Sequence, residues 1–210
     1  RLLNQGSAAS KSTTAQIDEA CGIMEAWSEV DADLANLNGN SAAFRLSEAE
    51  AFIEAMNIEF ARVLFYGTAA NPEQFVGLTP RYSDSTAANG SNIILGGGSG
   101  SDTSSVWLVV WGANTVHGIY PKGSSAGLSH KDLGLQVIET SAAMAGTRLE
   151  GYRDKFQWKC GIALKDWRYV VRGCNIDISN LVSKTSAADV IEMMIKMIHR
   201  VPNLKAGKAV

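Results

Sequence analysis

Residues 44–82 read FRLSEAEAFIEAMNIEFARVLFYGTAANPEQFVGLTPRY, and this stretch decides the fold. Its first half places Phe52, Met56 and Phe60 at steps of four residues, while charged and polar residues fill much of the remaining surface. Such spacing gathers the apolar side chains on one face of an α-helix. The pattern predicts a long amphipathic helix over residues 48–66 that packs on a core.

Both ends of this helix carry capping signals. Ser47 followed by Glu50 is a capping box, in which the hydroxyl accepts from the amide three residues on and the carboxylate reaches back. At the other end, Gly67 is suited to the left-handed conformation that closes many helices. A helix of this length spans roughly 28 Å, about the diameter of a small domain, so we expect it to act as a strut.

The same stretch resembles a known family. The segments FRLSEAEAFIEAMNIEFARVLFYG and NPEQFVGLTPRYS are similar to the spine-helix region of tailed-bacteriophage major capsid proteins with the Hong Kong 97 (HK 97) shell fold. Residues 106–112, 117–123 and 156–172 are similar to the same proteins in the same order. The resemblance therefore covers nearly the whole chain.

This resemblance implies an α+β, HK 97-like capsid fold with two domains. Residues 1–45 would form the end of an extended loop and the entry to a peripheral domain. Residues 46–182 would be that peripheral domain, with the spine helix and an antiparallel β-ribbon over residues 106–175. Residues 183–210 would open a partial axial domain, and since the family extends further at both ends, we expect a piece of a longer subunit.

The resemblance also implies a function. A major capsid (head) protein self-assembles into the icosahedral shell that encloses the double-stranded DNA genome of a tailed bacteriophage. Its expected partners are copies of itself in pentamers and hexamers, portal and scaffolding or decoration proteins, and the encapsidated DNA, contacted non-specifically. Its expected location is the virion, after assembly in the cytoplasm of the host bacterium. Such a protein is not an enzyme and needs neither a cofactor nor a membrane.

Composition agrees with a structural protein. The chain has 210 residues, 46% apolar and 19% charged, with a net charge of −2. Its 19 basic and 21 acidic residues are scattered, so no basic face predicts strong nucleic-acid binding. Apolar runs such as residues 106–111 are far shorter than the roughly 20 residues of a membrane-spanning helix. Three cysteines without a CxxC pair indicate buried thiols in a reducing cytosol.

No group of residues predicts a catalytic, cofactor-binding or metal site. His117, His130 and His199 are widely separated and lack the spacing of metal ligands. The glycines of residues 96–100 are not followed by the Gly-Lys-Ser/Thr of a phosphate-binding loop. No GxSxG motif marks a nucleophilic serine.

An acidic cluster precedes the strut, and it lacks the spacing of a calcium-binding loop. We expect its members to be solvated or to pair with an arginine of a neighbouring subunit. The cluster is Glu25, Glu29, Asp31 and Asp33, and the arginines are Arg45, Arg62 and Arg81.

The remaining chain is expected to alternate strands and loops. Residues 12–35 favour a helix, with a strand around Trp27 as the alternative. β-Branched and aromatic residues predict a buried strand at residues 106–112. Further expectations are an irregular arm or frayed end at residues 1–11, a loop at 83–105 with a hairpin around 93–95, a strand that ends in a turn at 119–123, and a surface excursion at 124–152.

Alternation with period two predicts strands at residues 156–164 and 167–171, which a bend at Lys165 and Asp166 would join into one long antiparallel ribbon. Ser186 is expected to cap a second helix that ends before Pro202.

The residues expected to matter are structural, and two other functions stay open. The residues are Ser47, Glu50, Phe52, Met56, Phe60 and Gly67 of the strut and Trp158, Trp167 and Tyr169 of the ribbon. One alternative, in the same fold, is an encapsulin-type compartment shell that holds cargo enzymes. The other is a small cytosolic serine hydrolase that uses Ser, His and Asp from the loops.

Overall fold

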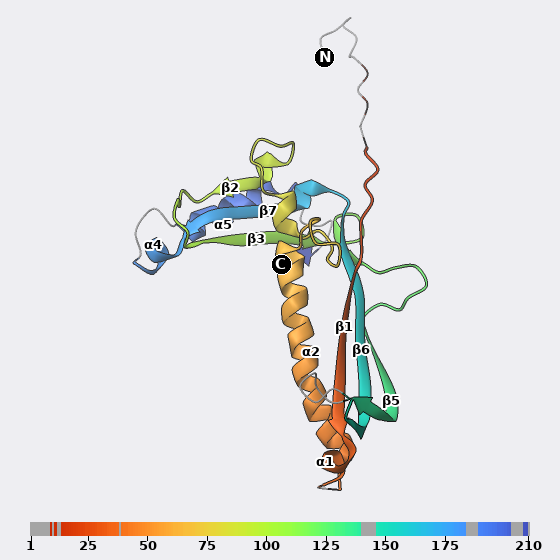
Figure 1. The fold of residues 1–210 in the computed structure, drawn as a ribbon. Helices are drawn as coiled ribbons and strands as arrows, with labels where there is room; N and C mark the ends of the chain where they lie inside the picture. The colour runs from red at the N-terminus through yellow and green to blue at the C-terminus, as the bar shows by residue number, and fades with distance from the viewer. Residues whose placement is uncertain are drawn as a thin grey trace, which may run out of the picture.

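The computed structural model describes residues 9, 11, 14–37, 39–139, 146–183, 189–202 and 208–209. The protein has two arms that cross (Figure 1). The upright arm holds α1, α2, β1, β5 and most of β6, and the crossing arm holds β2, β3, β7, α4 and α5 (Figure 1). The chain is thus elongated in two directions.

The elements follow one another along the chain in mixed order. They are β1 (Gly22–Asp31), α1 (Ala32–Asn36), α2 (Ser41–Tyr66), α3 (Leu78–Arg81), the 3-10 turn η1 (Gly90–Asn92), β2 (Ile93–Leu95), β3 (Thr103–Trp111), β4 (Val116–Ile119), β5 (Leu128–Glu139), β6 (Arg148–Leu164), the 3-10 turn η3 (Trp167–Tyr169), β7 (Val170–Asp177), α4 (Ile178–Val182), α5 (Val190–Arg200) and β8 (Lys208–Ala209).

One eight-stranded sheet runs through both arms, in the order β1-β6-β4-β3-β7-β2, with β5 paired to β6 and β8 paired to β3. The long strand β6 pairs antiparallel with β1 and β5 in the upright arm and, at its far end, with β4. A single parallel pair, Trp111 with Val116, links β4 to β3 of the crossing arm. The α+β class expected from the sequence is therefore correct.

The strut is present as α2, but it starts seven residues earlier than expected. Asn40 is its N-cap, and the Asn40 side chain accepts a hydrogen bond of 3.2 Å from the Ala43 amide. Ser47 and Glu50 lie inside the helix with exposed side chains. The predicted capping box is wrong, because the helix already begins at Ser41, so the backbone amides near Ser47 are bonded within the helix and need no cap.

Gly67 does end the helix, although not by the predicted left-handed cap. Its backbone has φ −56° and ψ 135°, and its amide donates to the Val63 carbonyl at 2.8 Å. A Cβ at this position would lie 2.2 Å from the Phe75 carbonyl oxygen and 2.7 Å from that of Val63. Glycine is required here because the following loop folds back against the helix end.

The first strand corrects the expectation of a helix over residues 12–35. β1 pairs in continuous register with β6, from Gly22 opposite Cys160 to Asp31 opposite Gly151. Only the short helix α1 follows it, capped by the Asp31 carboxylate, which accepts from the Asp33 amide at 2.8 Å. The alternative of a strand around Trp27 is the correct one.

Three further expectations about strands are wrong. Residues 124–152 contain all of β5 and the start of β6 in place of a surface excursion. β6 and β7 do not form one ribbon, because β7 pairs with β3 and β2, and Trp167–Tyr169 form a 3-10 turn. The residues 93–95 form β2, which pairs parallel with β7 and makes no hairpin.

The second helix agrees with the sequence in its extent. α5 ends at Arg200, before Pro202, and Asp189 caps it by accepting from the Glu192 amide at 2.9 Å. The predicted cap, Ser186, lies outside the described residues, as does most of the expected arm at residues 1–11. The strands expected at residues 106–112 and before residue 119 are confirmed as β3 and β4.

The buried side chains gather in three clusters along the two arms. One holds Val63, Phe75, Leu78, Tyr82, Val109, Val116, Cys160, Ile162 and Val170, where the arms meet. A second lies under α5 and includes Val110, Val171, Met193 and Met197. The third, formed by Ala49, Met56 and Phe156, runs under the lower part of α2. The fold thus has a chain of small cores in place of one large one.

Replacement of Gly67 by alanine tests the close approach at the helix end. The added methyl group cannot fit beside two backbone oxygens, so we expect a loss of about 3 kcal/mol in the free energy of unfolding. Urea denaturation followed by tryptophan fluorescence measures this loss. Gly118→Ala is the control, because a Cβ there meets only the Gly161 oxygen at 3.9 Å; equal losses in both variants would contradict the assignment.

Candidate assembly surfaces

The expected apolar face of α2 packs on the sheet face formed by β1 and β6. Phe60 stacks on Trp158 with ring centroids 4.7 Å apart, and its ring also lies 6.2 Å from that of Phe75. Met56 is buried against Phe156. The sequence therefore identified the residues that join the strut to the sheet.

Two of the other expected residues lie where the arms meet. The Trp167 carbonyl accepts hydrogen bonds from the Tyr82 hydroxyl at 2.7 Å and the Asn92 side-chain amide at 3.2 Å. Tyr169 packs on the cluster under α5. Tyr82 is fully buried, and this burial raises the pKa of its hydroxyl well above the usual range. Its phenol therefore serves as a fixed hydrogen-bond donor that ties residues 82 and 167 together.

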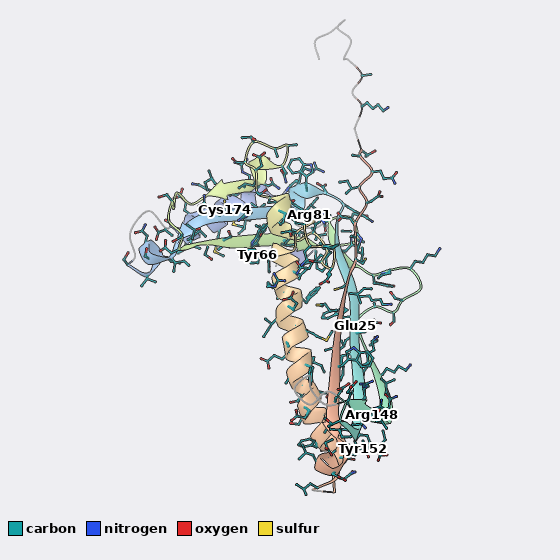
Figure 2. The ribbon with its side chains drawn as sticks, viewed as in Figure 1. Glu25, Tyr66, Arg81, Arg148, Tyr152 and Cys174 are labelled. Carbon is teal, nitrogen blue, oxygen red and sulfur yellow. The ribbon has the colours of Figure 1, made fainter. Side chains whose placement is uncertain are left out.

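A charged cluster fastens the lower half of α2 to the hairpin of β5 and β6. Arg45 donates to both carboxylate oxygens of Asp154, at 2.8 Å, and pairs with Asp132 at 2.8 Å. The Nε2 atom of His130 lies 2.8 Å from the same Asp154 carboxylate. The Arg45 guanidinium stands 4.8 Å from the ring centroid of Tyr152, which Figure 2 shows near the lower end of the upright arm.

This cluster matters because Asp154 is only 5% exposed. A buried carboxylate needs hydrogen bonds and an opposite charge to offset its lost hydration. We call Arg45, His130, Asp132 and Asp154 the hairpin clip. The sequence analysis did not predict this cluster, because its members come from three separate elements. The available signal was Asp154, an aspartate within a strand of alternating apolar and polar residues.

The acidic cluster near β1 finds most of its partners within the chain. Glu25 pairs with Lys155 at 2.9 Å, and this hydrogen bond holds the pKa of Glu25 below its usual range. Glu29 pairs with Arg153. The three arginines expected to pair across subunits also have internal carboxylate partners, namely Asp154 and Asp132 for Arg45, Glu59 for Arg62 and Glu19 for Arg81. A neighbour is not needed to neutralise them.

Neither a metal-ligand group nor a membrane-spanning helix is found in the described part of the chain. No group of three or more His, Cys, Asp or Glu side chains is placed there to hold a metal ion. No helix there is long and apolar enough to cross a membrane. Cys160 is buried, which raises the pKa of its thiol to about 11 and keeps it protonated.

Much apolar surface is left uncovered by the described residues. The exposed face of α5 presents Ile191, Met194, Ile195 and Ile198, and β5 presents Leu135 and Val137 near the tip of the upright arm. The chain exposes 13960 Å², whereas a compact protein of its mass of 22.4 kDa exposes roughly 9,400 Å². Such an excess of accessible surface is typical of a subunit whose surfaces are covered by other molecules in an assembly.

A long helix braced on a bent sheet, with exposed apolar surfaces on both arms, defines a structural subunit that builds larger assemblies. The family model of the major capsid protein GP7 matches residues 1–210. The chain therefore belongs to this family of capsid proteins, which are virion components and not enzymes. The predicted membership of a major capsid protein family is confirmed, and this membership favours the capsid protein over the serine-hydrolase alternative.

A solved structure supports the same conclusion. A chain of bacteriophage Epsilon15, in a near-atomic-resolution structure derived from cryo-EM and modelling, is similar at 30% sequence identity with a TM-score of 0.67. The match covers 95% of this chain and 60% of that chain. The chain thus spans about three fifths of the length of its structural relative. No curated protein matches it significantly.

Substitution of Arg45 by methionine tests the hairpin clip. It leaves Asp154 buried without its main counter-charge, so we expect a loss of about 3 kcal/mol in the free energy of unfolding. The matched control is Arg62→Met on the same helix, since Arg62 pairs with Glu59 at the surface and should cost less than about 0.5 kcal/mol. Chemical denaturation gives both values; similar losses would show that the clip has no special role.

Acid should weaken the same clip through Asp132. Hydrogen bonding from Arg45 lowers the pKa of Asp132 below its ordinary value of 3.8. A lowered pKa means that the ionised form stabilises the fold above pH 3.8 and that this contribution is lost as the pH falls further. The contribution is modest because Asp132 is half exposed. We expect Asp132→Asn to be less stable than the parent at pH 6, with the difference shrinking in thermal melts as the pH falls below 3.8.

Proposed function

We propose that this chain is the shell-forming part of a major capsid subunit, whose copies assemble through pentamers and hexamers into a closed icosahedral head around double-stranded DNA. The observation that carries this proposal is the uncovered apolar surface on both arms, together with membership of the GP7 family. Many modest contacts repeated around a closed shell stabilise it strongly, because each contact raises the effective concentration of the next.

We propose a division of labour within the subunit that does not coincide with the two arms. In our proposal, residues 46–182 form the peripheral domain, with α2 as its spine, and residues 1–45 bring in the end of an extended loop. Residues 183–210 begin the axial domain that gathers around the five-fold and six-fold axes. The two domains would meet in the cluster under α5, where Met193 and Met197 pack with Val110 of β3 and Val171 of β7.

The proposed partners follow from this role. Other copies of the chain come first, and portal and scaffolding or decoration proteins would contact the finished or growing shell. Contact with the genome would be weak and non-specific, because the net charge is −2 and the basic residues are scattered. The predicted residues Phe52, Met56, Phe60, Trp158, Trp167 and Tyr169 would act indirectly, by keeping the spine rigid on its sheet.

Imaging of the purified full-length protein tests this function. We expect hollow or DNA-filled icosahedral particles in electron micrographs and, from infected cells, particles that contain double-stranded DNA. Particles that contain a cargo enzyme and no genome would instead identify an encapsulin-type compartment. A protein that stays monomeric at high concentration would contradict assembly altogether.

A surface variant links the particles to the uncovered apolar residues. We expect the double substitution Leu135→Gln and Val137→Gln on β5 to leave the melting temperature nearly unchanged, because both side chains are already more than half exposed. Particle yield, measured by sedimentation, should fall. Ser129→Gln, also exposed on β5, is the control and should assemble normally; normal assembly of the double variant would exclude this patch from the subunit contacts.

A further inference from the structure

The two arms are connected at few points. Within its described residues, the chain passes between them three times, along residues 67–92 from α2 to β2, residues 112–115 from β3 to β4 and residues 165–169 from β6 to β7. The sheet continues from one arm to the other through one backbone pair, Trp111 with Val116. A single pair of strand residues leaves the angle between the arms to be fixed by other contacts.

Two side chains of the first connection bond to the third. The Tyr82 hydroxyl donates to the Trp167 carbonyl at 2.7 Å, and the Asn92 side-chain amide donates to the same carbonyl at 3.2 Å and to the Val170 carbonyl at 2.9 Å. Figure 2 shows Arg81, the residue before Tyr82, where the arms meet. The two connections that lead into the crossing arm are thus tied together.

The second connection is bonded to the third as well. The Lys165 amide donates to the Thr115 carbonyl at 2.9 Å, and the Thr115 hydroxyl donates to the Val110 carbonyl at 2.7 Å, which fixes the turn that carries this carbonyl. The end of β3, the start of β4 and the end of β6 are therefore held by one short network. We call Tyr82, Asn92, Thr115, Lys165 and Trp167 the inter-arm joint.

The side chains that donate in the inter-arm joint are buried. Tyr82 is fully buried, and Asn92 and Thr115 are two of the four polar or charged residues that are buried among those the structure describes. Burial removes such groups from water, a cost that phenylalanine, leucine or valine of similar size would avoid. What these polar side chains add, relative to apolar ones, is a bond of defined direction.

Apolar packing around the joint serves a different purpose. Val63, Leu78, Val109 and Val116 belong to the cluster that lies where the arms meet. Hydrophobic contacts are non-directional, so they hold the arms together over a range of angles. A hydrogen bond weakens steeply when its donor angle departs from the preferred geometry. The inter-arm joint therefore fixes the angle at which this cluster packs.

The angle between the arms matters in the proposed assembly. Both arms expose apolar surface for contacts with neighbours, including Ile195 on α5 and Val137 on β5. Successive copies close into a ring only when each contact turns the next subunit by the same amount. This rotation depends on how the contact surfaces of one subunit are oriented, and hence on the angle between its arms.

We infer that Tyr82, Asn92 and Thr115 are positioning residues, which set the angle between the two arms and thereby the curvature and diameter of the assembled shell. This inference rests on the proposed function and names the residues that determine its geometry. It also gives a role to buried polar groups that neither the apolar clusters nor the hairpin clip explains.

Distances between spin labels test the joint in the single subunit. The full-length protein carries labels at Ala51→Cys on α2 and Ser104→Cys on β3, both exposed sites, after Cys21→Ser removes the partly exposed native thiol. In unassembled protein, the parent should give one narrow distance distribution. The double variant Tyr82→Phe with Asn92→Leu should give a distribution about twice as wide, because more arm angles become populated.

Three further variants complete this test. Tyr82→Phe and Thr115→Val each remove one hydroxyl and should broaden the distribution to a smaller extent, so they serve if the double variant does not fold. Ile138→Ala lowers the stability of the upright arm from a buried site on β5 and should leave the distribution unchanged. A distribution as narrow in the folded joint variants as in the parent, or one equally broadened by Ile138→Ala, would overturn the inference.

Electron micrographs of assembled particles test the consequence for the shell. The parent should give one particle diameter, whereas the joint variants should give several diameters or open shells. Ile138→Ala should lower the particle yield and keep the parental diameter, because a loss of stability alone does not change the angle between the arms.

The outcomes separate the joint from the assembly itself. Joint variants with a broadened label distance and the parental particle diameter would overturn the link to shell curvature. Absence of particles from the parent would contradict the proposed function. The label distances, measured on the unassembled chain, would still decide whether the joint sets the angle between the arms.

Discussion

The contact between α2 and the sheet face of β1 and β6 is the constraint on which the structure depends. Phe60 on Trp158 and Met56 on Phe156 fix the helix along the strands, and Arg45 fastens its lower half through the buried Asp154. Most of the stability of a helix in a protein comes from such packing of its apolar face. The sheet gives it rigidity, and the helix in turn covers one face of the sheet in the upright arm, as α5 does in the crossing arm.

With so few layers, the chain leaves much of its apolar surface uncovered. The chain forms three small cores in place of one, and large apolar side chains stay exposed on both arms. A compact protein of this size would bury more of them, because surface grows more slowly than mass in a globular fold. In the proposed function, the remaining surface belongs to contacts with other subunits, which membership of the GP7 family supports.

Several elements could be predicted from the sequence because their signals are local. The spacing of Phe52, Met56 and Phe60 predicted the long helix and its packing face, and Gly67 predicted its C-terminal end. The alternation in β6, the apolar run in β3 and the basic last turn of α5 were equally readable. In the two helices the errors were confined to the caps, such as Asn40 in place of Ser47, whereas β6 begins eight residues before the predicted strand.

By itself, then, the sequence determined which residues turn inward, the α+β class and the capsid family, because burial patterns and side-chain identities are written along the chain. Only the tertiary structure decided which strands pair. Trp27 belongs to a strand because β6 lies beside it, and the polar β5 is a strand for the same reason. The hairpin clip also arises from residues far apart in sequence, since long-range hydrogen bonds and ion pairs produce no periodic pattern along the chain.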